Sequence, residues 1–380
     1  MANEMIITNA RVITRETAFT GTVGIKAGEF NRIDDRECKL SRAENWSGDY
    51  LLPGLVELHT DNLEKHLMPR PKVRWPELPA LMAHDAEIAA AGITTVFDAL
   101  GVGDVDAQAL RSQNMSVLIA GLDAAERDGL LRADHRLHVR CELPAENAVR
   151  LFEPFAGYSR VGLLSLMDHT PGQRQWMNME HARTYYTGKK GWSQEKFDGV
   201  VAESRELQAR YSEPHRRYFV EHARQRNIPL ASHDDTTPEH VAQARSEGIS
   251  ISEFPTTLEA ARSAQVSGLG VVMGAPNMVR GGSHSGNVAA ADLARAGLLD
   301  AFSSDYVPAS LMHAAFLLVD HAGFSVPAAI ATVSANPARL ARLDDRGEIA
   351  DGKRADFCRV RIISGLPKVV ATWRGGLRVV

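Results

Sequence analysis

Cysteine is scarce in this 380-residue chain, which has only three of them, far apart at Cys38, Cys141 and Cys358. An odd number of isolated cysteines excludes a disulfide framework, and their spacing excludes a C-x-x-C metal knuckle. We therefore expect a protein of a reducing, cytoplasmic compartment.

The chain also lacks a long hydrophobic run and an excess of positive charge. No run approaches the roughly 18 apolar residues that mark a membrane span, and the start, MANEMIITNA, has no basic segment before an apolar one. A formal net charge of −4 offers no basic field for non-specific nucleic-acid binding. These absences predict a protein that is neither secreted nor embedded in a membrane and that has no nucleic-acid partner.

What the chain has instead is eight short apolar runs, each of which ends in polar residues. Such runs are typical of strands buried on both faces, hence parallel strands, and most gaps between them are long enough for a helix. Eight strand and helix units predict a (β/α)8 TIM barrel of the α/β class over residues 51–344. The runs are Leu55–His59, Ile93–Ala99, Leu137–Glu142, Val161–His169, Ile228–His233, Ile249–Phe254, Leu269–Ala275 and Leu299–Asp305.

Helical patterns fill the gaps of the predicted barrel, for example over 80–91 and 238–248. The longest gap, residues 170–227, is polar and carries charged helical patterns over 193–211 and 213–226. We interpret it as an insertion over the mouth of the barrel, and insertions of that size often carry substrate contacts.

The two ends of the chain have a different character. Short strands with alternating side chains are predicted at 5–13, 356–362 and 368–373, with glycines at the turns between them. Residues 1–50 and 345–380 together predict one small β-sandwich domain beside the barrel.

The ends of the predicted strands carry most of the chemistry. The stretch 52–61 ends in His59 and Asp61, which lie on one face of a strand because they are two residues apart. An imidazole and a carboxylate together suit zinc, manganese or iron. The other run ends contribute further acids and histidines: Asp98, Glu142, Asp168, His169, His233, Asp234, Asp235, Glu253 and Asp305.

In a barrel these strand ends converge on one rim, where the catalytic groups of such folds lie. A single histidine after a strand is more often a hydrogen-bonded structural residue than a metal ligand. So many acids at one rim, however, would repel one another by roughly several kcal/mol unless cations neutralised them. We therefore expect a pair of divalent metal ions at this rim.

Basic groups follow three of the predicted strands, and they suit the binding of phosphate groups. The alternatives stay open, because a basic segment is usually a solvated face and a Gly-Gly pair usually closes a tight loop. For His84, a role at the amino end of a helix is also open. The candidate substrate-binding residues are Lys65, Arg70, Lys72, Arg74, His84, Arg174, Arg280, Gly281, Gly282 and His284.

Longer features of the sequence resemble a known family. The opening PG-x-x-E-x-H, the last strand ending in Ser304-Asp305 and the tail GEIADGKRAD at 347–356 resemble the amidohydrolase superfamily over essentially the whole chain. Strings such as LLPGLVELHTDNLEKH, LMDHTPGQRQ and MGAPNMVRGGSHSGNVAA resemble the branch of that superfamily in bacterial phosphonate metabolism. Matches of this length are far more specific than a short motif.

The resemblance implies a binuclear metal centre, with zinc as the first choice and manganese or iron as the others. The motif HTD at 59–61 stands where the superfamily has His-x-His, and SEF at 252–254 replaces the usual histidine of the sixth strand. No lysine is present on the fourth strand to bridge the metals, so Glu142 is the substitute bridge. The implied metal ligands are His59, Asp61, Glu142, His169, His233 and Asp305, and Asp305 is also the implied catalytic residue, which handles the proton of the attacking water.

The reaction that the resemblance implies is the hydrolysis of α-D-ribose 1-methylphosphonate 5-triphosphate to the 5-phosphate and pyrophosphate, in phosphonate catabolism by the C–P lyase pathway. One alternative is an amidohydrolase that acts on a cyclic amide, an amidine or an N-acyl substrate and needs few basic loop residues. A barrel without activity is another alternative, against which the retained ligands argue. Barrels with terminal β-domains often pair, so a homodimer is also expected.

Overall fold

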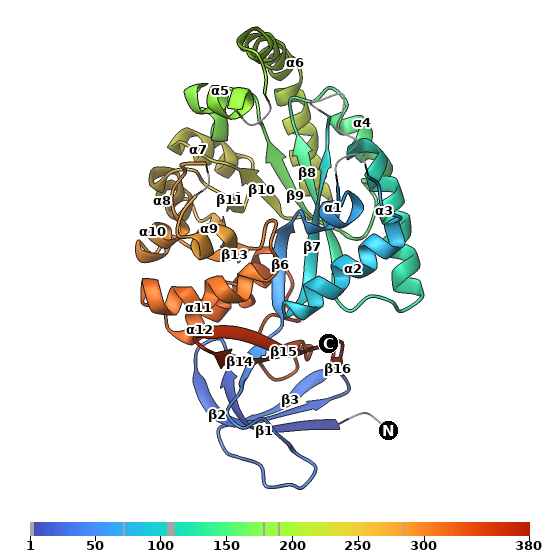
Figure 1. Cartoon of the computed structure of the whole chain (residues 1–380), viewed down its shortest axis with the longest axis vertical. Helices are drawn as coiled ribbons and strands as arrows, with labels where there is room; N and C mark the ends of the chain where they lie inside the picture. Colours follow the sequence, from blue (N-terminus) through green and yellow to red (C-terminus); the bar gives the residue numbers. More distant parts are fainter. Residues whose placement is uncertain (1–3, 71–72, 105–110, 178, 189–190, 284) are drawn as a thin grey trace. The chain divides into compact units, whose positions relative to one another are not determined.

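The computed structural model describes residues 4–70, 73–104, 111–177, 179–188, 191–283 and 285–380. Among these residues, no helix is both long enough and apolar enough to span a membrane. Two eight-stranded sheets and the helices around them make up the structure (Figure 1).

The parallel sheet has the strand order β13-β12-β11-β10-β9-β8-β7-β6. The two ends of this order also meet, because Thr60 pairs in parallel with Asp305. The predicted α/β barrel is therefore confirmed. Its strands are β6 (Leu55–Thr60), β7 (Ile93–Val102), β8 (Asp134–Glu142), β9 (Val161–Met167), β10 (Leu230–His233), β11 (Ile251–Glu253), β12 (Gly270–Gly274) and β13 (Ala301–Ser303).

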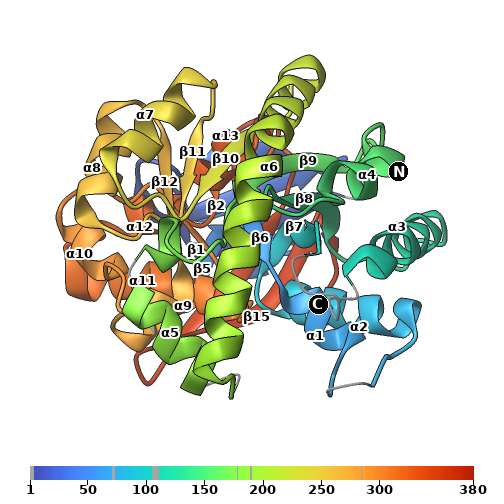
Figure 2. The same ribbon diagram turned by 90° about the horizontal axis from the view of Figure 1, so that it is seen from above.

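The helices begin and end where local chemistry requires it. The predicted helices over 80–91 and 238–248 are confirmed as α2 (Glu77–Ala90) and α7 (Pro238–Ser246). The Thr237 side chain caps α7 by accepting a hydrogen bond from the His240 N–H, and proline fills the first helical position. α7 lies beside α8 (Figure 2). The remaining helices are α1 (Asn62–Leu67), α3 (Arg111–Arg127), α4 (Ala148–Phe152), α5 (Met179–Gly188), α8 (Leu258–Val266), α9 (Ala275–Arg280), α10 (Ala290–Arg295), α11 (Ser310–Ala322), α12 (Val326–Ala331) and α13 (Ala335–Leu340), with 3-10 turns η1 (Glu153–Phe155) and η2 (Arg174–Trp176).

The insertion differs from the prediction in one respect. The sequence pattern divided its charged part at residue 212, whereas the structure has one continuous helix, α6 (Gln194–Arg226), with Pro214 inside it (Figure 2). Proline removes one backbone hydrogen bond, but it does not have to end a helix whose flanking turns are held by packing. Phe197 and Phe219, on either side of Pro214, are both buried.

The terminal sheet has the order β16-β15-β14-β5-β1-β2-β3, with β4 paired to β1 (Figure 1). Three strands separate β14 from β3 in this order, so in a flat sheet they would lie roughly 19 Å apart. The rings of Phe30 in β3 and Phe357 in β14 are nevertheless 5.9 Å apart. The structure therefore has one sheet that curls around a single core, whereas the sequence predicted a sandwich of two sheets. Its strands are β1 (Glu4–Ile13), β2 (Ala18–Lys26), β3 (Glu29–Asp34), β4 (Glu44–Asn45), β5 (Tyr50–Pro53), β14 (Phe357–Ile363), β15 (Leu366–Arg374) and β16 (Leu377–Arg378).

The chain divides into two compact units. The first unit contains residues 1–98, 120–136 and 273–380, and the second contains residues 99–119 and 137–272. The domains predicted from the sequence are divided differently, with one domain for each sheet. They comprise residues 1–50 plus 345–380 and residues 51–344, and these boundaries remain a prediction. The candidate ligands are described below within each unit.

Candidate metal centre

In the first unit, the backbone brings His59, Asp61 and Asp305 together. The Asp305 N–H donates to the His59 carbonyl (3.0 Å), and the Asp61 N–H donates to the Asp305 carbonyl (2.8 Å). His59 Nε2 lies 3.6 Å from Asp61 Oδ1, and one ligand atom of each of the three residues lies within 4.8 Å of the others. The first unit thus offers one imidazole and two carboxylates to a single cation.

A buried acidic residue, Glu57, holds the backbone next to His59 and Asp305 in place. It accepts hydrogen bonds from the backbone N–H groups of His59 and Ser304, both at 2.6 Å, and so ties the ends of β6 and β13 together. Burial raises the pKa of Glu57 to about 8. Asp305 has a φ of 54°, a left-handed conformation that is uncommon outside glycine and typical of functional sites.

In the second unit, His169, His233 and Asp234 form a matching group within 4.8 Å. His169 Nδ1 lies 2.5 Å from a Glu142 oxygen, and His233 Nδ1 lies 2.7 Å from a Glu253 oxygen. A carboxylate on Nδ1 fixes the tautomer, so that Nε2 carries the lone pair that a metal ion binds. His233 Nε2 indeed lies 3.5 Å from Asp234 Oδ2, close enough for both to bind one ion.

Glu142, the predicted bridge between the metals, also accepts a hydrogen bond from the His169 N–H (3.0 Å). Burial alone would lower the pKa of His169, but the charge of Glu142 outweighs it and raises that pKa. The contacts of Glu142 orient His169, and its role as a bridge remains a prediction.

The residues present fit divalent metal ions. Each unit offers imidazole nitrogen and carboxylate oxygen, and this mixed set of ligands suits zinc, manganese and iron alike. In the second unit both imidazoles have a carboxylate partner on Nδ1, which is one of the usual outer partners of metal-binding histidines.

Sequence reasoning missed two residues. Asp234 was noted at a strand end but not chosen as a ligand, although it completes the group of the second unit in a left-handed conformation (φ 56°). His138 was taken as structural, yet its Nδ1 lies 3.9 Å from Glu253. The period of two along β8 could have found it, because His138, Arg140 and Glu142 point to one face of the strand.

His84, which the sequence predicted to bind substrate, lies in a buried hydrogen-bond network, and its role in binding remains a prediction. Its side chain is fully buried, its Nδ1 lies 3.1 Å from the Asn62 amide, and its Nε2 lies 2.7 Å from Asp98. The other Asp98 oxygen lies 2.7 Å from Nδ1 of the equally buried His135, which also approaches Asp85 at 3.3 Å. At these distances the histidine nitrogens are hydrogen-bonded to the carboxylate oxygens. The nitrogen and oxygen atoms are too close together for a metal ion to lie between them.

This network makes folding stability depend on pH. Burial would lower the pKa of His135, but the charges of Asp98 and Asp85 raise it to about 9. Relative to the ordinary histidine pKa of 6.5, such a pKa corresponds to about 3 kcal/mol of stability, which is fully present below pH 6.5 and is lost as the pH rises through 9. His84, Arg132 and the backbone N–H of Ala133 are the other partners of these carboxylates.

We expect His135→Gln to lower the free energy of unfolding by about 3 to 5 kcal/mol near neutral pH, because it leaves buried carboxylates without their cation. Urea unfolding at pH 6.5 and pH 9 should show that the variant loses less stability between these pH values than the wild type. His321→Gln, at an exposed position of the same unit, is the control. Parallel pH profiles of His135→Gln and wild type would contradict the assignment.

The remaining substrate-binding candidates lie in different environments. Lys65 donates to the Tyr306 carbonyl, and Arg74 pairs with Glu77 at 2.9 Å. Arg70 and Arg280 are exposed. Their role in binding remains a prediction.

The predicted glycine loop has a structural role as well. Gly281 ends α9 in the left-handed conformation (φ 79°), which is the usual task of a glycine at the end of a helix. Gly282 donates its N–H to the Asn277 carbonyl (2.9 Å). Lys72 and His284 lie outside the described residues.

Comparisons with known proteins identify the family and the fold. Residues 200–380 match the amidohydrolase family. The structure is similar to N-acetyl-D-glucosamine-6-phosphate deacetylase from Mycobacterium smegmatis (TM-score 0.65, 15% identity, all of both chains). It is also similar to dihydropyrimidinase from Brevibacillus agri NCHU1002 (TM-score 0.62, 13% identity, 100% of this chain and 95% of that one). At these identities the similarity concerns the fold alone.

One curated relative is much more similar in sequence. The chain is 45% identical over 377 residues to α-D-ribose 1-methylphosphonate 5-triphosphate diphosphatase of Escherichia coli K12, and the match covers 99% of this chain and 100% of the relative. The fold, the acids and histidines at the strand ends and this identity lead to one conclusion. The chain belongs to the α-D-ribose 1-methylphosphonate 5-triphosphate diphosphatase family of amidohydrolases.

Proposed function

We propose that the chain hydrolyses α-D-ribose 1-methylphosphonate 5-triphosphate to the 5-phosphate and pyrophosphate, as a step of phosphonate catabolism. The observation that carries this proposal is the 45% identity to the E. coli diphosphatase over the full length of both chains. The ligand groups of the two units support it, because the hydrolysis of a triphosphate needs charge neutralisation more than covalent chemistry.

Two divalent ions, zinc before manganese or iron, would be held by the two groups. His59, Asp61 and Asp305 would hold one ion, and His169, His233 and Asp234 the other, with Glu142 as the proposed bridge. Bound there, the ions would activate water and neutralise phosphate oxygens.

The chain's own residues perform the other tasks. Asp305, held by its backbone contacts to His59 and Asp61, accepts the proton of the water that attacks the α-phosphorus. Glu142 and Glu253 hold the two imidazoles in one orientation, so the site need not reorganise during the reaction. The basic side chains Lys65, Arg70 and Arg74, with Lys72, bind the phosphate oxygens that do not react.

The setting that we propose follows from the same features. All three cysteines are free, which fits the cytoplasm. A small phosphorylated sugar is the partner rather than nucleic acid, since the net charge is −4. We also expect a homodimer, as in many barrels with a terminal β-domain.

The test is to incubate the metal-loaded protein with the ribose triphosphate in ¹⁸O-labelled water and to follow the products by ³¹P NMR and mass spectrometry. We expect equal amounts of pyrophosphate and 5-monophosphate, with the label in the monophosphate, because attack at the α-phosphorus puts the new oxygen there. Dihydropyrimidine and N-acyl compounds are assayed separately as alternative substrates. Turnover of these substrates without any release of pyrophosphate would contradict the proposal and favour a cyclic amide hydrolase.

A further inference from the structure

A polar cavity of about 280 Å³ lies in the second unit, between η2, the middle of α6 and the start of α7. Its lining includes the side chains of Gln173, Arg174, Ser212, Arg216, His240 and Gln243. Four of these side chains, Gln173, Arg174, Ser212 and Arg216, come from the insertion that the sequence pattern predicted to carry substrate contacts.

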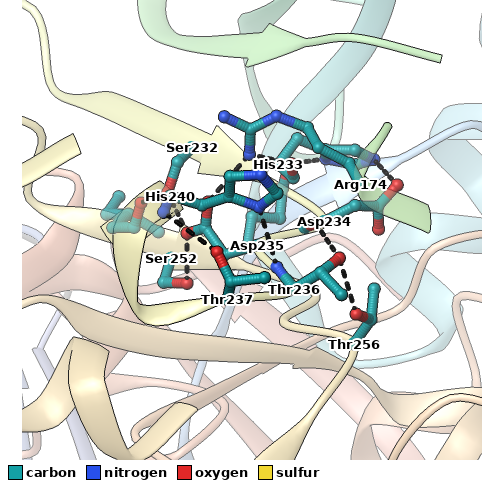
Figure 3. Close-up of polar contacts among 12 residues, drawn as sticks. Arg174, Ser232, His233, Asp234, Asp235, Thr236, Thr237, His240, Ser252 and Thr256 are labelled. Atoms are coloured by element: carbon teal, nitrogen blue, oxygen red, sulfur yellow. Dashed lines mark hydrogen bonds and ion pairs between the residues drawn. The ribbon is translucent and has the colours of Figure 1, made fainter. Parts of the chain in front are cut away.

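Two buried arginines face this cavity. Arg174 is only 5% exposed, and its Nη1 donates to the His233 carbonyl and to Asp235, both at 2.8 Å (Figure 3). Arg216 is 6% exposed, and its Nη1 donates to Glu247 at 2.7 Å. Among the described residues these contacts use one nitrogen of each guanidinium, so the carboxylates anchor the arginines while Nε and Nη2 are left for a ligand.

His240 and Ser212 add neutral donors. His240 Nδ1 accepts a hydrogen bond from the Thr236 N–H (3.2 Å), which places the ring proton on Nε2 (Figure 3). Burial and the neighbouring charge of Arg174 lower the pKa of His240, so it stays neutral. The Ser212 hydroxyl is buried without a hydrogen-bond partner among the described residues, a condition that a bound ligand would relieve.

The acids of the lining already have partners. Asp168 accepts hydrogen bonds from the Thr170 N–H (3.0 Å) and from the Gln208 amide (2.8 Å). Glu213 lies 3.8 Å from Arg217 on the outer side of α6. The groups that remain for a ligand are therefore mainly donors, which suits an oxyanion with several acceptor oxygens.

We propose that this cavity binds a phosphonate or phosphate group of the substrate that lies away from the phosphorus under attack. The Arg174 contact to the His233 carbonyl places the cavity beside a proposed metal ligand of the same unit. The inference rests on the proposed function for the identity of the ligand. The group bound is either the phosphonate on the sugar or the pyrophosphate portion that departs.

The experiment measures the binding of methylphosphonate and of inorganic pyrophosphate to the metal-loaded protein by titration calorimetry. We expect Arg216→Gln to weaken the binding of one of the two anions about tenfold or more, because it removes charge-assisted hydrogen bonds. Ala209→Leu, which narrows the cavity and leaves every ion pair in place, should have the same effect, and it keeps the test valid if Arg216→Gln does not fold. Arg224→Gln, an exposed position on α6 paired with Glu221, is the matched control and should bind as the wild type does.

The anion that responds identifies the bound group: methylphosphonate indicates the sugar phosphonate, and pyrophosphate indicates the leaving group. Anion binding that depends on Arg216 supports the cavity even if the protein does not hydrolyse the triphosphate, a result that would count against the proposed function alone. A wild type that binds neither anion would overturn the inference. So would cavity variants that bind both anions as tightly as the wild type.

Discussion

Asp305→Asn is expected to keep its bound metal and to hydrolyse the triphosphate about 10³-fold more slowly, within the range of roughly 10² to 10⁴ for the loss of a general base. Asparagine has the size of aspartate and retains an oxygen ligand, but it cannot accept a proton. It also tolerates the left-handed backbone at this position (φ 54°) better than most residues, so the hydrogen bonds to His59 and Asp61 should persist. The variant therefore separates proton transfer from metal binding.

The measurements are metal content by mass spectrometry and kcat across the pH range. Asp320→Asn, at an exposed position on α11 in the same unit, should match the wild type in both. A fully active Asp305→Asn would remove the residue from the mechanism. A variant that loses its metal along with its activity would make Asp305 a ligand whose part in proton transfer is not demonstrated.

The barrel could be predicted because its signal is local. A parallel strand that is buried on both faces must be a continuous apolar run, and its carboxyl end must be polar, so the eight runs define both the strands and the rim. The pairing of Thr60 with Asp305 joins the first and last of these runs. The positions of His59, Asp61 and Asp305 follow from that geometry, since each lies at or just after a strand end.

The features that the sequence did not predict depend on contacts between residues that are far apart in the chain. His84, Asp98 and His135 are far apart in the sequence, and nothing near His84 shows that two buried partners will enclose it. The curl of the terminal sheet depends on the packing of Phe30 against Phe357, more than three hundred residues away. Pro214 is a helix breaker by local rules, but α6 is long enough on both sides to continue through it.

His233→Ala is expected to remove the metal ion of the second unit and to lower hydrolysis by about 10³-fold or more, since an ion that neutralises the phosphates is worth several kcal/mol. Glu253→Gln should have a smaller effect. It leaves His233 in place but replaces a charged acceptor for Nδ1 (2.7 Å) with a neutral one, which costs about 10- to 100-fold in metal affinity. His321→Ala, at an exposed position, serves as the control for removing a histidine. Metal content and affinity in His233→Ala equal to those of the wild type would contradict the ligand assignment.

Combining the two substitutions decides how Glu253 acts. If Glu253 affects the metal only through the ring of His233, then Glu253→Gln should have no further effect on metal affinity once His233 is alanine. If Glu253 binds an ion itself, the two effects should add. His138 Nδ1 lies 3.9 Å from the Glu253 carboxylate. Additive effects would therefore identify His138 and Glu253 as further metal ligands that the strand-end pattern did not predict.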